Sequence, residues 1–125
     1  MRVEAYRNLH QNCWSVRALE GPDKGRVIHR ATTLRLSDCR FVVQPAGRNK
    51  VREQKKKNVH AFVRGTWGRS DPRVLKNCVE VTYNPYKHDT FVQLTEPGVA
   101  AHAADEVLLT FSPRPHVYAL YARRN

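Results

Sequence analysis

The segment Gln44–Lys76 has the sequence QPAGRNKVREQKKKNVHAFVRGTWGRSDPRVLK, and its change of pattern decides the fold expected for the chain. It holds ten of the 22 Lys and Arg residues but only two acidic residues, Glu53 and Asp71. Ala46–Lys57 follows a proline and contains a single β-branched residue, so we expect a short basic helix there. In Asn58–Trp67 the pattern changes to a period of two, which predicts a half-buried strand.

The strand expected after the helix divides its side chains between two faces. One face is apolar and typical of a core, and it consists of Val59, Ala61 and Val63. The other is cationic and aromatic, and it consists of His60, Phe62 and Arg64. An aromatic ring between an imidazole and a guanidinium is suited to stacking on unpaired bases. The alternative is that Phe62 belongs to the core and that His60 has a structural role.

The remainder of the chain predicts strands separated by turns that contain Gly, Pro or Asn. The expected strands lie within 1–9, 14–19, 26–30, 33–36, 41–44, 78–83, 90–94, 107–111 and 117–121, and 99–105 is expected to be a helical turn or a loop. We therefore expect one domain, residues 1–125, with a mainly β fold of the α+β type. Its small antiparallel sheet would be curled or partly closed as a barrel and would carry one short helix. A RelE-like or barnase-like α+β toxin fold is the alternative.

Composition limits the classes of function. A formal net charge of +11 and an isoelectric point near 10.1 favour a polyanionic partner or an acidic protein surface. The sequence contains no apolar run long enough for a membrane span and no signal peptide, so we expect a soluble cytoplasmic protein without a membrane partner.

The cysteines and histidines do not form a recognisable metal motif. Three cysteines at wide spacing, Cys13, Cys39 and Cys78, favour reduced thiols over a disulfide framework. His10 and Cys13 have the spacing of half a zinc site, but no second close pair follows. We expect no metal and no other cofactor.

The basic helix contains like-charge pairs four residues apart, Arg48 with Arg52 and Arg52 with Lys56. Such pairs are unfavourable in an isolated helix, but bound phosphates can supply the missing counter-charge. A merely solvated face is the alternative. The predicted nucleic-acid contacts are Arg48, Lys50, Arg52, Lys55, Lys56, Lys57, His60, Phe62, Arg64, Trp67 and Arg69.

An enzymatic alternative is a small metal-independent RNase. Such an enzyme needs a proton acceptor, a proton donor and a cation near the reacting phosphate, and His, Tyr and Arg can fill these roles. The candidate residues are His60, His88, Arg64 and Tyr83. The sequence lacks a phosphate-binding P-loop, a zincin motif and a nucleophile elbow.

Three short runs carry a resemblance to known proteins: Tyr6–His10, Lys57–Val63 and Tyr83–Tyr86. They are similar to segments of small uncharacterised proteins of bacteriophages and prophages. This resemblance implies action in a bacterial host cell, and it adds an inhibitor of a host protein as a third class of function. An inhibitor that competes with nucleic acid is usually acidic, whereas this chain is basic.

The sequence thus predicts a binding protein rather than an enzyme, with single-stranded DNA or RNA as its partner. Interleaved aromatic and basic residues favour single strands over duplex. The choice between DNA and RNA, the sequence preference and the oligomeric state stay open.

Overall fold

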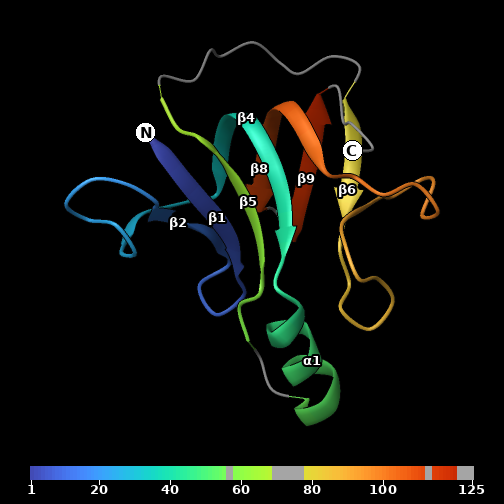
Figure 1. Cartoon of the computed structure of the whole chain (residues 1–125). Coiled ribbons are helices and arrows are strands. Elements are labelled where there is room, and N and C mark those ends of the chain that lie inside the picture. The colour runs from blue at the N-terminus through green and yellow to red at the C-terminus, as the bar shows by residue number, and fades with distance from the viewer. Residues whose placement is uncertain (56–57, 69–77, 112–113, 121–125) are drawn as a thin grey trace.

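The computed structural model describes residues 1–55, 58–68, 78–111 and 114–120. It contains a short helix and strands that form a sheet (Figure 1). The elements are β1 (Arg2–Asn8), β2 (Cys13–Ala18), β3 (Val27–Ala31), β4 (Thr33–Val43), α1 (Pro45–Gln54), β5 (Ala61–Thr66), β6 (Val79–Thr82), β7 (Val92–Gln93), β8 (Ala103–Phe111) and β9 (Pro115–Leu120).

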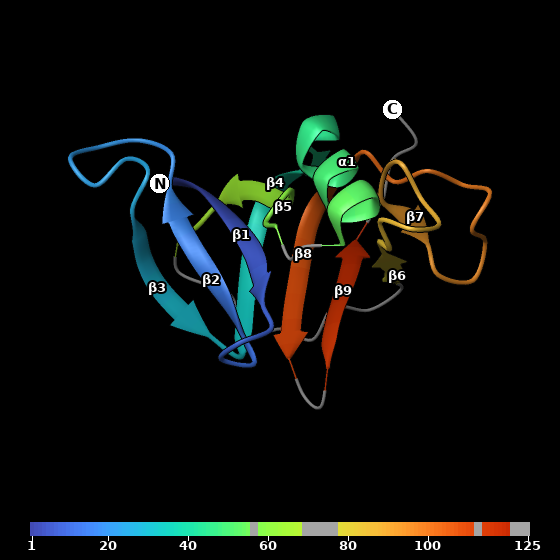
Figure 2. The same cartoon turned by 90° about the horizontal axis from the view of Figure 1, so that it is seen from below.

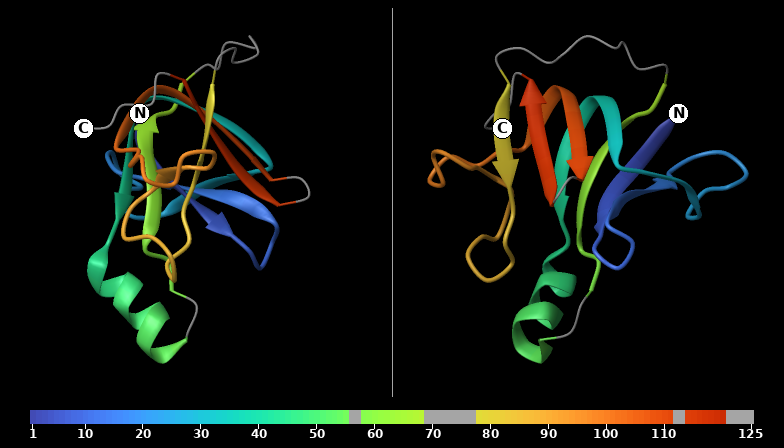
Figure 3. Two further views of the ribbon diagram at one scale, coloured as in Figure 1. Left: turned by 90° about the vertical axis from the view of Figure 1, so that its right-hand side faces the viewer. Right: turned by 180° about the vertical axis from the view of Figure 1, so that it is seen from behind.

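All the strands belong to one sheet in the order β3-β2-β1-β5-β4-β8-β9-β6-β7, and all neighbours are antiparallel. The sheet curls but does not close, because the edge strands β3 and β7 do not pair (Figure 3). Trp14 Nε1 on β2 donates to the Thr110 carbonyl on β8 at 2.8 Å, across the curl. The expected mainly antiparallel, curled fold with one short helix is confirmed.

The core fills the inner side of the curl. Its fully buried residues come from both halves of the sheet and include Val3, Val16, Val63, Val107 and Leu109. Since the two halves of the sheet bury apolar side chains against each other, the sheet needs no helical layer over this side. The helix is free to occupy the end of the sheet instead.

Two expectations on local structure are wrong. Residues 33–36 and 41–44 were expected to form separate strands, but β4 runs through both with a register shift at Ser37–Arg40. Asp38, at φ 50°, forms the irregularity, which lets the long strand bend with the sheet. Residues 103–105 belong to β8 rather than to a helical turn, because β4 supplies hydrogen-bonding partners that local propensity does not reveal.

Helix α1 begins at Pro45, whose fixed φ suits the first helical turn, and ends before Lys55 in the left-handed conformation. It is shorter than the predicted Ala46–Lys57. Only Gly47 and Val51 are buried on it. A Cβ on Gly47 would lie 2.5 Å from the Cβ of His60, so only glycine permits this close approach of the helix. Figure 2 shows α1 at the end of the sheet.

Alternation in β5 is confirmed, but the predicted exposure of its second face is wrong. Val63 packs in the core, whereas Phe62 on the opposite face is only 2% exposed. The Arg17 guanidinium lies 5.3 Å from the centre of the Phe62 ring and 5.7 Å from that of Tyr6. Neighbouring strands therefore cover the ring. Val59, expected in the core, precedes the strand and is 46% exposed.

The three cysteines all carry free thiols. Cys39 lies in the core, and burial raises the pKa of its thiol to about 12. Within the described residues, no helix is long and apolar enough to cross a membrane.

Phe62→Ala should lower the free energy of unfolding by about 3–5 kcal/mol, because the truncation leaves a cavity beneath Arg17 and Tyr6. The exposed Val59→Ala is the matched control, and its change should stay within about 0.5 kcal/mol. Urea unfolding of both variants measures the difference. Near-equal stability of the two variants would contradict the burial of Phe62.

Candidate functional site

An open groove of about 850 Å³ lies beside α1. In Figure 1 the β1–β2 turn, the start of β5 and the loop after β6 all lie at the helix end of the sheet. We call this site the strand-end groove. Its lining consists of Tyr6–His10, Val51, Asn58–Ala61 and Thr82–Tyr86.

The three runs that resemble phage proteins are far apart in the sequence but meet in this groove. Tyr6–His10 contributes one wall, part of Lys57–Val63 the floor, and Tyr83–Tyr86 another wall. The tertiary structure therefore gathers all three runs at a single site.

His60 and Tyr83 form the buried floor of the groove. The Nδ1 atom of His60 lies 2.8 Å from the Asn58 carbonyl oxygen, and its Nε2 atom lies 2.7 Å from the Tyr83 hydroxyl. A carbonyl can only accept, so Nδ1 carries a proton and donates it. In neutral His60, Nε2 then accepts the Tyr83 hydroxyl proton. This arrangement holds an acid–base pair in a defined tautomer.

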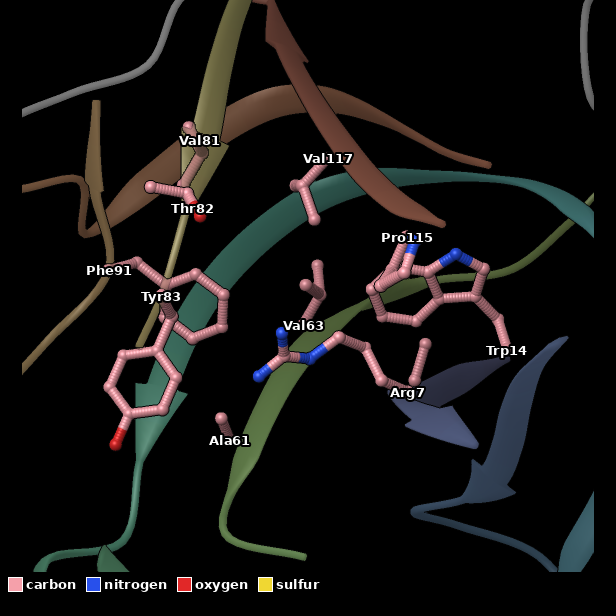
Figure 4. A pocket seen from close by; sticks show the side chains of 11 residues that line it. Arg7, Trp14, Ala61, Val63, Val81, Thr82, Tyr83, Phe91, Pro115 and Val117 are labelled. Atoms are coloured by element: carbon pink, nitrogen blue, oxygen red, sulfur yellow. The ribbon is translucent and has the colours of Figure 1, made fainter. Parts of the chain in front are cut away.

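Two arginines add positive charge around Tyr83. Arg48 on α1 donates from Nε to the Pro85 carbonyl at 3.2 Å. Arg7, at the end of β1, points its guanidinium toward Tyr83 from the other wall (Figure 4). Burial raises the pKa of the Tyr83 phenol, although the charges of Arg48 and Arg7 act to lower it and Asp89 acts to raise it further.

The exposed rim of the groove includes apolar and aromatic side chains. Leu9, Val59 and Tyr86 are 54%, 46% and 58% exposed, respectively, and all three line the groove. The Tyr86 hydroxyl lies 3.4 Å from the Val51 carbonyl, which ties this ring to α1. A cationic interior under a rim with apolar and aromatic side chains suits a ligand that combines an anionic group with flat apolar surface.

The structure brings only part of the predicted nucleic-acid contacts to this end of the molecule. Lys50, Arg52 and Lys55 are exposed on or just after α1, and Arg48 and His60 border the groove. The predicted contacts Lys56, Lys57 and Arg69 lie outside the described residues.

The other predicted contacts lie elsewhere. Phe62 is buried, so it offers no exposed stacking surface. Arg64 is half-buried and its Nε lies 3.3 Å from a Glu4 carboxylate oxygen. Trp67 lies at the far end of β5, where it stacks on His29 with the ring centres 4.8 Å apart.

The residues proposed for an RNase are also divided. His60 and Tyr83 are in contact, as described. His88 is on the neighbouring turn, where its Nδ1 accepts the Asn84 amide proton at 3.1 Å. Arg64 is paired with Glu4 and does not line the groove, so Arg7 and Arg48 supply the nearby positive charge instead.

Charge and periodicity did not single out Arg7, Leu9 or Tyr86. All three lie in the short runs that resemble phage proteins, which is the available signal, but the sequence does not show that these runs meet. Within the described ranges, no group of three or more His, Cys, Asp or Glu residues could hold a metal ion.

Comparison with known proteins identifies the origin of this chain. A family model described as the Mycobacterium phage L5 gene 82 protein matches residues 1–114. The chain belongs to this phage gene 82 family. The gene 82 protein of Mycobacterium phage L5 is 44% identical over 98 residues, covering 74% of this chain and 77% of the relative. The resemblance to phage proteins is thereby confirmed, and no solved structure matches the chain.

In this gene 82 family member, the buried Tyr83 should make stability depend on alkaline pH. A folded-state pKa above the unfolded value of about 10 stabilises the fold below pH 10, and this contribution is lost as pH rises through the folded pKa. The wild type should therefore lose more stability than Tyr83→Phe above about pH 10. Urea unfolding of both proteins across this pH range measures the free energy of unfolding. Parallel curves of this free energy against pH would contradict the raised pKa of Tyr83.

Proposed function

We propose that this protein binds single-stranded nucleic acid, with the strand-end groove taking a nucleotide and the exposed side of α1 holding neighbouring phosphates. The observation that carries the proposal is the position of the groove. Its rim carries apolar and aromatic side chains above half-buried arginines, and it adjoins a helix whose exposed charges are mainly basic. Bases can stack on the aromatic rim, and phosphates can bind the cations of the groove and the helix.

The stacking surface differs from the one expected from the sequence. Phe62 is covered by Arg17, whereas the Tyr86 ring is exposed in the groove. Stacking on an exposed tyrosine requires a base whose face is free, which favours single strands over duplex. The family's phage origin supports action in the cytoplasm of a bacterial host, with host or phage nucleic acid as the partner.

The charge on α1 supports the phosphate part of the proposal. Its first turn contains no acidic residue, and Gln44, the N-cap residue before the helix, makes no capping hydrogen bond through its side chain. Arg48 and Arg52 lie four residues apart on the same side, with no acidic residue between them. The two like charges repel each other in the free protein, and bound phosphates along the helix would offset that repulsion by attracting both.

Affinity for a single-stranded oligonucleotide should fall about 300-fold between about 50 and 200 mM salt if the protein neutralises about six phosphates. Lys50→Gln and Arg52→Gln should each weaken binding and reduce the slope of log affinity against log salt by about one. Fluorescence anisotropy at several salt concentrations measures both effects.

Lys24→Gln is the matched control for these variants. Lys24 is also exposed, but it belongs to the turn between β2 and β3, away from α1 (Figure 1). For Lys24→Gln, the slope of log affinity against log salt should equal that of the wild type. Absent binding, or an affinity that does not change with salt, would remove the proposal.

The His60–Tyr83 contact favours a second candidate function, cleavage of RNA without a metal. In this reaction the 2′-oxygen attacks the adjacent phosphorus, the bond to the 5′-oxygen breaks, and a 2′,3′-cyclic phosphate forms. One group must accept the 2′-hydroxyl proton and another must protonate the leaving oxygen. A histidine and a phenol in hydrogen-bond contact near two arginines offer these properties.

RNA incubated with the protein in EDTA should then yield fragments with cyclic phosphate ends, whereas DNA should stay intact because it lacks the 2′-hydroxyl. Tyr83→Phe and His60→Gln should each lower the rate by about a hundredfold or more, and His29→Gln serves as the distant control. Circular dichroism checks that the variants fold. RNA that is bound but uncut in both EDTA and magnesium would leave a binding protein alone.

A further inference from the structure

The guanidinium of Arg7 is a half-buried charge without a counter-charge in the described part of the chain. Three other partly buried arginines have acidic partners: Arg17 and Arg64 pair with Glu4, and Arg2 with Asp38. No such carboxylate lies within ion-pair distance of Arg7 among the described residues. Burial lowers the pKa of Arg7, and the nearby Tyr83 acts to raise it.

Aromatic and aliphatic groups surround this charge. Arg7 extends between the strand-end groove and a small cavity of about 30 Å³, and it lines both. Trp14, Tyr83 and Phe91 form walls of the small cavity (Figure 4). An isolated charge in such surroundings is unfavourable unless something else compensates it. An anionic ligand that enters from the groove would supply that compensation.

The neighbouring groups restrict the kind of anion. Arg48 adds a second positive charge near Tyr83, and the exposed Asn58 contributes an amide side chain to the lining. The rim residues Leu9 and Tyr86 provide apolar and aromatic surface at the opening. A phosphate attached to a nucleoside matches both parts, since the phosphate suits the cations and the base suits the rim.

We propose that Arg7 is the phosphate-binding residue of a single-nucleotide subsite inside the strand-end groove. The proposal rests on the function inferred above and makes it specific: one phosphate of the strand contacts Arg7, while its base lies on the rim near Tyr86. The exposed cations of α1 then hold adjacent phosphates by charge alone. The subsite distinguishes nucleotides from nucleosides, whereas the helix responds to any polyanion.

Arg7→Met tests the subsite because methionine retains an unbranched apolar side chain but removes the charge. Calorimetric titrations would compare a nucleoside 5′-monophosphate, the corresponding nucleoside and inorganic phosphate. The wild type should bind the nucleotide about tenfold or more tightly than the nucleoside, and Arg7→Met should lose this difference. Arg26→Met, in the exposed turn between β2 and β3, is the control and should behave as wild type.

Thermal unfolding of the free variants distinguishes binding from a structural role. Removal of an uncompensated charge should leave the melting temperature of Arg7→Met equal to or above that of the wild type. A clear fall in melting temperature, together with equal losses of nucleotide and nucleoside affinity, would assign Arg7 to packing and overturn the proposal. Equal affinity of the wild type for nucleotide and nucleoside would overturn it as well.

A parallel titration with short single-stranded oligonucleotides, with and without a 5′-phosphate, separates the two proposals. Oligonucleotide binding that Arg7→Met leaves unchanged would overturn the subsite and leave the proposed function intact. Nucleotide binding that depends on Arg7, without oligonucleotide binding, would support the subsite and overturn the proposed function. If the 5′-phosphate raises the affinity of the wild type and Arg7→Met abolishes that increase, the subsite binds a strand end. If the 5′-phosphate does not raise the affinity, the subsite binds an internal phosphate.

Discussion

His60 connects the segments that form the helix end of the molecule. Its backbone carbonyl accepts from the Gln44 amide at 2.7 Å, which joins the start of α1 to the start of β5. Its ring connects Asn58 to Tyr83, and its Cβ abuts Gly47. With only Gly47 and Val51 buried on α1, the helix has little apolar contact of its own. The position of the basic helix beside the groove therefore depends largely on this buried histidine, and the hydrogen bonds of Arg48 to Pro85 and of Tyr86 to Val51 add to it.

Side chains of β1 alternate between the two faces of the sheet, so that, within the described part of the chain, a charge with ion-pair partners lies on one face and a charge without them on the other. Glu4 points to one face, where two arginines neutralise it and Arg17 also covers Tyr6 and Phe62. Arg7, three residues later, points to the other face and meets aromatic rings. A paired cluster of this kind contributes to folding, whereas an unpaired cation in a concave site suits a ligand. The same strand thus carries a structural network and a candidate binding residue.

The strands and the helix were largely predictable because their signals are local. Alternation marked β5, the Gly-Pro turn marked the β2–β3 hairpin, and Pro45 marked the start of α1. Exposure was less predictable. A period of two assigns Phe62 and Val63 to opposite faces, but it does not show that Arg17 and Tyr6 cover the second face. The predicted stacking surface was wrong for that reason.

The sequence by itself determined the mainly β class, the basic charge and the phage resemblance, since composition, periodicity and short runs are properties of neighbouring residues. Only the tertiary structure decided where charge is left uncompensated. Arg7, His60 and Tyr83 are far apart in the chain, and they meet because the order β1-β5-β4-β8-β9-β6 curls the sheet and brings the ends of β1, β5 and β6 together at α1. A groove depends on such long-range pairing, which local sequence preferences do not encode.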